Sequence, residues 1–205
     1  MESLKDYIRE NRASATRIAV VAAVLLIAAP VTWYFVHTSE EKAYVNFTNG
    51  YYYYRNHNYD QAAGALQQLI DLYPNSDFTP LGRYYLGLTY LEVNHLPDAA
   101  GQFQYFIDQN PKHFLRDRVY AMWMSLELQS GHPDNCVSLA DRYLAEFPKD
   151  APATPEILYR KGVALLQLGR TADAESCFDA AGAGAKETNV YSNFSFYART
   201  AHSAM

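Results

Sequence analysis

The apolar positions of this chain follow two different patterns along its length. Residues 18–36 (IAVVAAVLLIAAPVTWYFV) carry no charged side chain and are apolar on every side. From residue 43 onward, apolar residues instead recur every three or four positions, which is the spacing of helices that bury one face. The sequence therefore predicts an all-α chain in which one uniformly apolar helix precedes a series of amphipathic helices.

The uncharged stretch has the length of a membrane span. At ~1.5 Å rise per residue, a helix over residues 18–36 covers roughly 29 Å, close to the hydrocarbon thickness of a bilayer. Trp33 and Tyr34 lie near its end, where amphipathic rings favour the headgroup layer, and membrane helices tolerate a proline such as Pro30. We expect a retained single-pass transmembrane helix; the alternatives are a cleavable signal peptide and a buried core helix. No lipobox cysteine follows the stretch, so we do not expect a lipoprotein.

Basic residues predict the orientation of that span. Four precede it and two follow it within 20 residues: Lys5, Arg9, Arg12 and Arg17, then Lys42 and Arg55. Because basic residues favour the cytoplasmic side, we expect the N-terminus in the cytoplasm and the remainder of the chain outside it. The reversed topology is the alternative.

A pattern of small residues and prolines recurs about every 37 residues along the rest of the chain. The recurring positions are a small residue in a first helix, a small residue in a second helix, and a proline after the second helix: Gly50, Gly87 and Gly162; Ala62, Ala99, Cys136 and Ala174; Pro74, Pro111 and Pro148. Such a unit is a pair of antiparallel helices, because the small residue of the first helix lets the second approach closely.

Bulky residues are placed to fill the space beside the small ones. Leu66, Phe103 and Phe178 lie at helical spacing from the small residues of the second helices. The third copy departs most, because Met124 and Glu127 stand where a small and an aromatic residue are expected. One pair cannot bury its apolar face alone, so we expect about four hairpins to stack into a superhelix closed by a C-terminal capping helix.

These units resemble the tetratricopeptide repeat (TPR), a helix–turn–helix motif of about 34 residues. The stretch LGRYYLGLTYLEVNHLPDAAGQFQYFIDQNP carries the resemblance most clearly. The expected layout is a cytoplasmic tail over residues 1–17, the transmembrane helix over 18–36, a linker over 37–42, TPR-like repeats over 43–182, and a capping helix and tail over 183–205.

Composition and motifs give no support for catalysis or for nucleic-acid binding. The 205-residue chain has a formal net charge of −5, whereas a phosphate-binding surface normally carries excess positive charge. The sequence contains no H-E-x-x-H, G-x-S-x-G, P-loop or dinucleotide glycine motif, and no recognisable nucleophile–base pair. We therefore expect no catalytic, cofactor-binding or metal-binding residues and no enzyme activity.

The histidine and cysteine positions fit a structural role. His57, His95 and His132 fall in the turns of successive repeats, ~10 Å apart, which is too far for ligands that must lie about 2 Å from one metal ion. Cys136 and Cys177 lie on second helices, where buried thiols are the default. A disulfide between them is left open, since it needs Cα atoms within about 7 Å.

Aromatic residues mark the expected binding surface. In the TPR architecture that this chain resembles, the first helices line a concave groove. The positions expected to face this groove are aromatic and aliphatic: Phe47, Tyr51, Tyr54, Tyr84, Leu88, Leu91, Tyr159, Val163 and Leu166. Rigid rings give contact area at low entropic cost, which favours peptide binding. Some of the four consecutive tyrosines 51–54 must be core, because consecutive helical residues face all sides.

The layout also resembles bacterial inner-membrane repeat proteins, notably the ancillary subunit of the Sec translocon. This resemblance implies a non-catalytic scaffold at the periplasmic face of the inner membrane, which acts as an adaptor or chaperone-like module for envelope or secreted proteins. The implied partners are other proteins, embedded in the membrane or emerging from it, and the lipid bilayer through the single span; nucleic acid is not among them. The alternative is a structural subunit that stabilises a large respiratory, photosynthetic or secretion complex.

Overall fold

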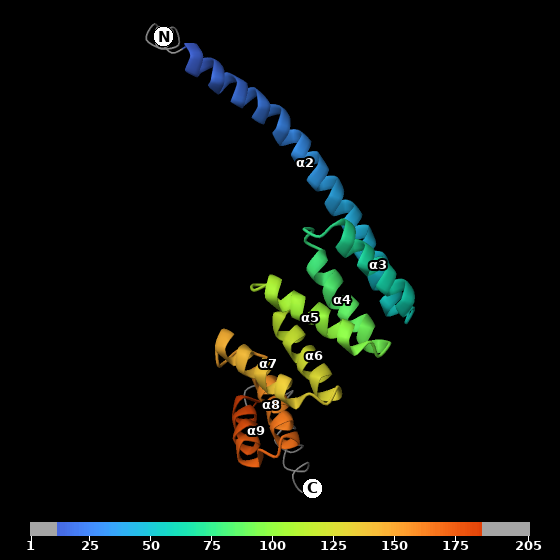
Figure 1. Ribbon diagram of the computed structural model, residues 1–205, viewed down its shortest axis with the longest axis vertical. Helices are drawn as coiled ribbons and strands as arrows, with labels where there is room; N and C mark the ends of the chain where they lie inside the picture. The colour runs from blue at the N-terminus through green and yellow to red at the C-terminus, as the bar shows by residue number, and fades with distance from the viewer. Residues whose placement is uncertain (1–11, 186–205) are drawn as a thin grey trace.

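The structure is a computed structural model that describes residues 12–185, and all of its elements in this range are α-helices (Figure 1). In chain order they are α2 (Arg12–Arg55), α3 (Tyr59–Leu72), α4 (Thr79–Glu92), α5 (Leu96–Gln109), α6 (Arg116–Gln129), α7 (Pro133–Glu146), α8 (Thr154–Gln167) and α9 (Thr171–Ala185). Nearly all of the expected capping helix and tail, and most of the expected cytoplasmic tail, lie outside the described residues.

The helices pair into antiparallel hairpins. The lower half of α2 packs against α3, and the pairs α4–α5, α6–α7 and α8–α9 follow. Successive first helices also touch, α2 against α4 and α6 against α8. Figure 1 shows the hairpins stacked one after another in a curved row that starts at the end of α2. The predicted all-α, TPR-like superhelix is confirmed.

The first helix is one unbroken element of 44 residues. It runs from the uncharged stretch into the first repeat, so residues 37–42, expected as a linker, are helical as well. Its N-terminal part projects from the repeats as a rod with Pro30 inside it (Figure 1). Among the described residues, α2 is the one helix long and apolar enough to cross a membrane, by length and composition.

Each hairpin turns through one residue in the left-handed region. The φ angles are 59° at His57, 58° at Asn94, 75° at Gly131 and 74° at Gly169. The amide of the next residue then donates a hydrogen bond to the carbonyl group five residues before it. For example, His95 N donates to Tyr90 O at 2.8 Å. This is the Schellman closure of a helix end, and it satisfies a carbonyl that would otherwise lack a partner. The same turn is therefore built four times within the described range.

The close approach predicted from the small residues is present. A Cβ added to Gly50 would lie 2.6 Å from Leu66 Cδ2, and one added to Gly162 would collide with the ring of Phe178. In the third hairpin Met124 is fully buried, and Glu127 is buried with 6% of its surface exposed. The Glu127 carboxylate accepts hydrogen bonds from Trp123 Nε1 at 2.8 Å and from Asn135 Nδ2 at 2.9 Å. It thus ties α6 to the start of α7.

Candidate functional site

Aromatic rings gather where α2 meets α4. The ring of Tyr85 lies 4.9 Å from that of Tyr51, 5.4 Å from that of Tyr54 and 5.9 Å from that of Phe47. These four residues, here called the aromatic patch, are each partly exposed. Edge-on and tilted ring pairs of this kind stabilise by ~0.5–1.5 kcal/mol beyond the area they bury. The patch joins two successive first helices and leaves part of each ring accessible to a partner.

The hydroxyl groups of the patch have distinct polar environments. Tyr51 Oη accepts a hydrogen bond from Arg55 Nη1 at 3.2 Å. Burial and, to a smaller extent, the nearby Glu92 carboxylate raise the pKa of Tyr54 to about 12. Burial also raises the pKa of Tyr85. Tyr54 and Tyr85 are therefore protonated at neutral pH, and their O–H groups can donate hydrogen bonds to a peptide carbonyl at the edge of an otherwise apolar contact.

The structure corrects the sequence-based choice of Tyr84. Only 6% of Tyr84 is exposed, and its side chain belongs to the main hydrophobic core. Its neighbour Tyr85 presents the ring that meets α2 instead. The reason is helical phase: Tyr85 lies two residues before Gly87, about 200° around the helix from the side that packs against Phe103 of α5, and so it meets α2. Tyr84, one position earlier, lies in the core with residues of α5 and α6. The spacing to Gly87 was the signal that could have distinguished the two tyrosines.

The other positions expected in the groove are half-buried and lie in three places. Phe47, Tyr51 and Tyr54 meet in the aromatic patch. Leu88 and Leu91, farther along α4, pack against the main core. The remaining three, Tyr159, Val163 and Leu166, lie on α8, where the Tyr159 ring is 5.7 Å from that of Phe178. The structure therefore brings together the α2 residues around Tyr85, whereas the α8 residues form a separate group two hairpins away.

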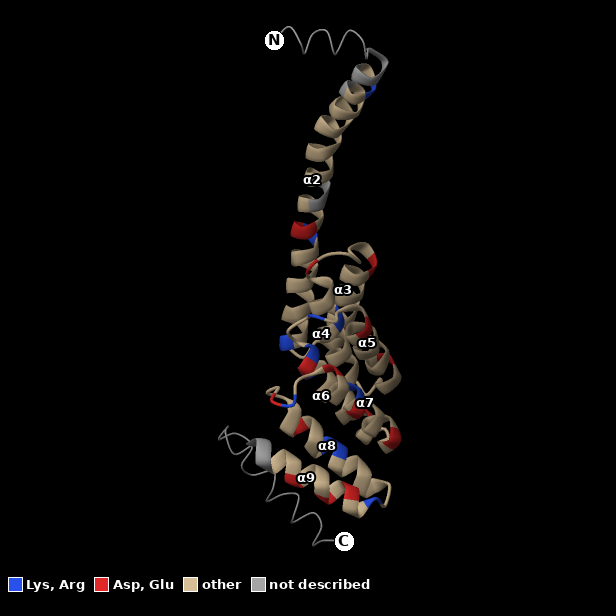
Figure 2. Cartoon of the chain, turned by 90° about the vertical axis from the view of Figure 1, so that its left-hand side faces the viewer, with Lys and Arg blue, Asp and Glu red and all other residues tan. Residues whose placement is uncertain are grey.

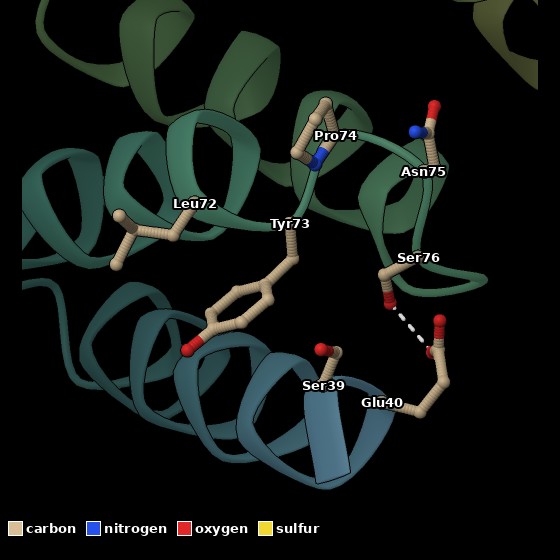
Figure 3. A pocket seen from close by; sticks show the side chains of 7 residues that line it. All are labelled: Ser39, Glu40, Leu72, Tyr73, Pro74, Asn75 and Ser76. Atoms are coloured by element: carbon tan, nitrogen blue, oxygen red, sulfur yellow. Dashed lines mark hydrogen bonds between the residues drawn. The ribbon is translucent and has the colours of Figure 1, made fainter. Parts of the chain in front are cut away.

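A second feature is the pocket beside α2, where the helix leaves its apolar stretch (Figure 3). The pocket has a volume of about 310 Å³ and is lined by Ser39 and Glu40 of α2 and by residues 72–76 at the end of α3. Glu40 Oε2 accepts hydrogen bonds from Ser76 Oγ at 2.7 Å and from the Asp77 amide at 3.3 Å. These two hydrogen bonds hold the α3–α4 loop against α2 and fix the part of α2 around Glu40 relative to the repeats.

Charge separates the two sides of the stack. The second helices α3, α5, α7 and α9 carry ten acidic residues and one basic residue, Arg142. The first helices, counted from residue 43, carry six basic and four acidic residues. Figure 2 shows acidic residues spread over α5, α7 and α9 and a long uncharged length of α2. By charge, an acidic partner segment is therefore better matched to the first-helix side than to the second-helix side.

Within the part of the chain that the structure describes, no group of three His, Cys, Asp or Glu side chains could hold a metal ion. Cys136 and Cys177 are both free. Burial raises the pKa of Cys136 to about 12 and also raises that of Cys177, so neither thiol is activated as a nucleophile. What the aromatic patch presents for binding is a set of partly exposed aromatic rings and hydroxyl groups that can donate hydrogen bonds.

Comparison with protein families gives two matches. The family model YfiO, described as an outer membrane lipoprotein, matches residues 39–129, and a tetratricopeptide repeat model matches residues 122–187. Together they run from α2, just beyond the uncharged stretch, to the end of α9. No curated protein matches the chain.

Solved structures show the same fold. A Podosopora anserina chain titled as a kinesin light chain with nearly identical TPR-like repeats has a TM-score of 0.60 at 13% identity, over 89% of this chain and 97% of that one. A MamA structure has a TM-score of 0.57 at 18% identity, over 91% of this chain and 90% of that one. A second MamA structure, MamA AMB-1, has a TM-score of 0.55 at 18% identity, over 80% of this chain and 84% of that one. With the tetratricopeptide repeat match over residues 122–187 and the stacked hairpins described above, the chain has the tetratricopeptide repeat fold.

Proposed function

We propose that this chain is a membrane-anchored adaptor that binds segments of other proteins close to the membrane surface. Proteins of the TPR type generally mediate protein–protein interactions and are non-catalytic. The observation that carries the proposal is that three of the four residues of the aromatic patch, Phe47, Tyr51 and Tyr54, lie on α2, the same helix that holds the uncharged stretch. A partner bound at the patch would be held by a surface rigidly continuous with the membrane anchor.

The length of α2 sets the height of the patch above the bilayer in this proposal. Phe47 lies 11 residues beyond Val36 and Tyr54 lies 18 residues beyond it. At ~1.5 Å per residue, the patch would extend from roughly 16 to 27 Å outside the hydrocarbon layer. A partner segment that reaches this zone has just left the membrane or belongs to a membrane protein. Tethering would raise its effective concentration at the patch.

We further propose the layout and location suggested by the sequence. Residues 18–36 would span the inner membrane of a bacterium, with residues 1–17 in the cytoplasm, and the repeats over 43–182 and the segment 183–205 in the periplasm. The excess of basic residues before the span supports this orientation. The match to a family described as an outer membrane lipoprotein supports an envelope location. The clients would be envelope or secreted proteins, bound in an adaptor or chaperone-like role.

Affinity purification in mild detergent tests the proposal. The full chain is compared with a variant carrying Tyr51→Ala and Tyr85→Ala, and with a control carrying Tyr52→Ala, whose ring is 62% exposed and lies outside the patch. An adaptor should recover a varied set of envelope proteins that the patch variant loses and the control retains. A constant, stoichiometric set would instead favour a structural subunit of a large complex. Recovery that does not change in the patch variant would contradict binding at the patch.

A further inference from the structure

The loops that follow the second helices lie on the side of the stack from which α2 enters. The hydrogen bonds from Ser76 and Asp77 to Glu40 hold the α3–α4 loop against α2 four residues beyond Val36. Four helical residues rise ~6 Å, and the headgroup region on each side of a bilayer is roughly 5–8 Å thick. If residues 18–36 span the membrane, as proposed above, this loop lies at the level of the lipid headgroups.

The next loop along the stack lies beside the first one. Residues 74–76 of the α3–α4 loop and Asn110 at the end of α5 line one shared pocket of about 270 Å³. Figure 1 also shows the α5–α6 loop on the edge of the stack that faces the projecting part of α2. The α5–α6 loop, residues 110–115, is therefore carried toward the same membrane surface.

The α5–α6 loop presents a large apolar side chain to solvent. Phe114 is 78% exposed, more than any other large hydrophobic residue beyond the uncharged stretch within the described range. Its ring stacks on that of His113, with centroids 4.6 Å apart. His113 in turn packs edge-on against Phe106 at 5.0 Å, and its Nδ1 accepts a hydrogen bond from the Leu115 amide at 3.1 Å. Phe114 is thus held outward on a fixed base, and the exposed Lys112 lies two residues away.

We infer that the α5–α6 loop is a second membrane contact, in which Phe114 enters the headgroup layer of the bilayer spanned by α2 and Lys112 faces the lipid phosphates. An exposed ring next to a lysine is the combination that binds a bilayer interface: the ring partitions into the interface and the ammonium pairs with anionic groups. Two contacts, one spanning and one peripheral, would fix the tilt of the repeat stack. The inference rests on the proposed span and adds an orientation that the span alone does not determine.

Quenching of tryptophan fluorescence by brominated lipids tests this inference in the full-length protein. Three single-tryptophan variants are reconstituted in vesicles of phosphatidylcholine and phosphatidylglycerol, with and without bromine on the upper part of the acyl chains. The first retains Trp33 and carries Trp123→Phe. The second carries Phe114→Trp with both native tryptophans changed to Phe. The third carries Tyr52→Trp in the same background and serves as the control far along α2.

The inference predicts that bromine quenches Trp33 and the residue introduced at position 114 to a similar extent and leaves the one at position 52 unquenched. Quenching at 33 without quenching at 114 would overturn the inference while leaving the span in place, and this is also the result expected if Phe114 binds a protein. Quenching at both 114 and 52 would overturn the proposed orientation. No quenching at 33 would refute the span itself.

The loss of the Trp123 hydrogen bond to Glu127 could unfold the repeats, so helicity is checked by circular dichroism. If folding fails, the same comparison is made between wild type and Phe114→Trp with both native tryptophans retained. The additional emission should then be quenched by bromine, and unquenched additional emission would overturn the inference.

Discussion

Gly87 lies against the ring of Phe103 so closely that a Cβ added to Gly87 would meet Phe103 Cε1 at 2.5 Å. The two residues are 16 positions apart, and the same separation relates Gly50 to Leu66 and Gly162 to Phe178. In the third hairpin the corresponding positions hold Met124 and Ala140, which are both fully buried. The large residue has moved to the first helix and the small residue to the second. The hairpin keeps its packing because the two volumes are exchanged.

Replacing Gly87 by alanine should destabilise the fold. The change gains helix propensity, but the fully buried Phe103 ring cannot move aside, and overpacking of a core costs about 1–3 kcal/mol. The matched control is Gly101→Ala on α5, where an added Cβ meets nothing within 4 Å and the gain should be ~0.5–1 kcal/mol. Denaturant unfolding measures both. A Gly87→Ala variant as stable as Gly101→Ala would contradict the packing account.

The large and small residues that are exchanged in the third hairpin, Met124 and Ala140, can be introduced at the equivalent positions of the second hairpin, Gly87 and Phe103. Gly87→Met alone should destabilise more than Gly87→Ala, because its longer side chain meets the same ring. Adding Phe103→Ala should restore much of the lost stability, as the double variant reproduces the Met124–Ala140 arrangement. A double-mutant cycle on the free energy of unfolding measures the coupling, which should be favourable by about 1–3 kcal/mol. Additive effects of the two changes would show that the exchange is not a packing relation.

A network around Glu146 predicts acid sensitivity. Its carboxylate accepts from Arg116 Nη2 at 2.6 Å, from Tyr120 Oη at 2.9 Å and from Arg142 Nε at 3.0 Å. Partial burial opposes the charge, but these three donors outweigh it and hold the pKa of Glu146 below its usual value. A carboxylate with a lowered folded-state pKa stabilises the fold above the unfolded pKa and loses that contribution as the pH falls through the folded value.

Glu146→Gln should therefore cost about 1–3 kcal/mol at pH 7, since the buried Arg116 loses its anionic partner. The stability difference from wild type should shrink as the pH is lowered below about 4. The control is Asp150→Asn in the exposed α7–α8 loop, which should retain the acid sensitivity of wild type. Urea unfolding across pH 3–7 gives the comparison. A stability difference for Glu146→Gln that does not vary with pH would argue against this network.

The left-handed turn residues predict a stabilising substitution. Asn94 holds φ at 58°, a conformation that costs L-residues about 1–2 kcal/mol and glycine very little. The equivalent positions in the third and fourth hairpins are already Gly131 and Gly169. Asn94→Gly should therefore be neutral or stabilising by ~0.5–1 kcal/mol, and Gly131→Ala destabilising by a similar amount, as read from thermal unfolding. Destabilisation by Asn94→Gly would mean that its side chain contributes more than the turn geometry indicates.

The sequence predicted the parts of the fold that depend on local spacing. Small residues at Gly50, Gly87 and Gly162 identified the hairpins, because close helix packing leaves room for nothing larger. The exchange of Met124 with Ala140 was missed because each position was considered separately, whereas packing depends on the summed volume of a pair. The continuity of α2 through residues 37–42 was also missed. Within this stretch Glu40 accepts hydrogen bonds from Ser76 and Asp77, contacts far along the chain that no local pattern reveals.

The candidate surface was predicted less well than the fold. Phe47, Tyr51 and Tyr54, which were expected to share one surface, do meet around Tyr85. Tyr84 was chosen in place of Tyr85 because a one-residue error in helical register rotates a side chain by ~100° and moves it from the surface to the core. Which face of a repeat binds a partner depends on the stacking of hairpins and on the charge of their second helices, and both become visible only in three dimensions.

Site-specific photo-crosslinking in intact membranes tests the central claim most directly. A photoreactive phenylalanine derivative is placed at Tyr85 in the aromatic patch and, as the control, at the exposed Tyr52. The account predicts that position 85 crosslinks to membrane proteins or to segments that emerge from the membrane, and that position 52 does not. Products at position 85 that come only from freely soluble proteins, or equal yields at both positions, would contradict it.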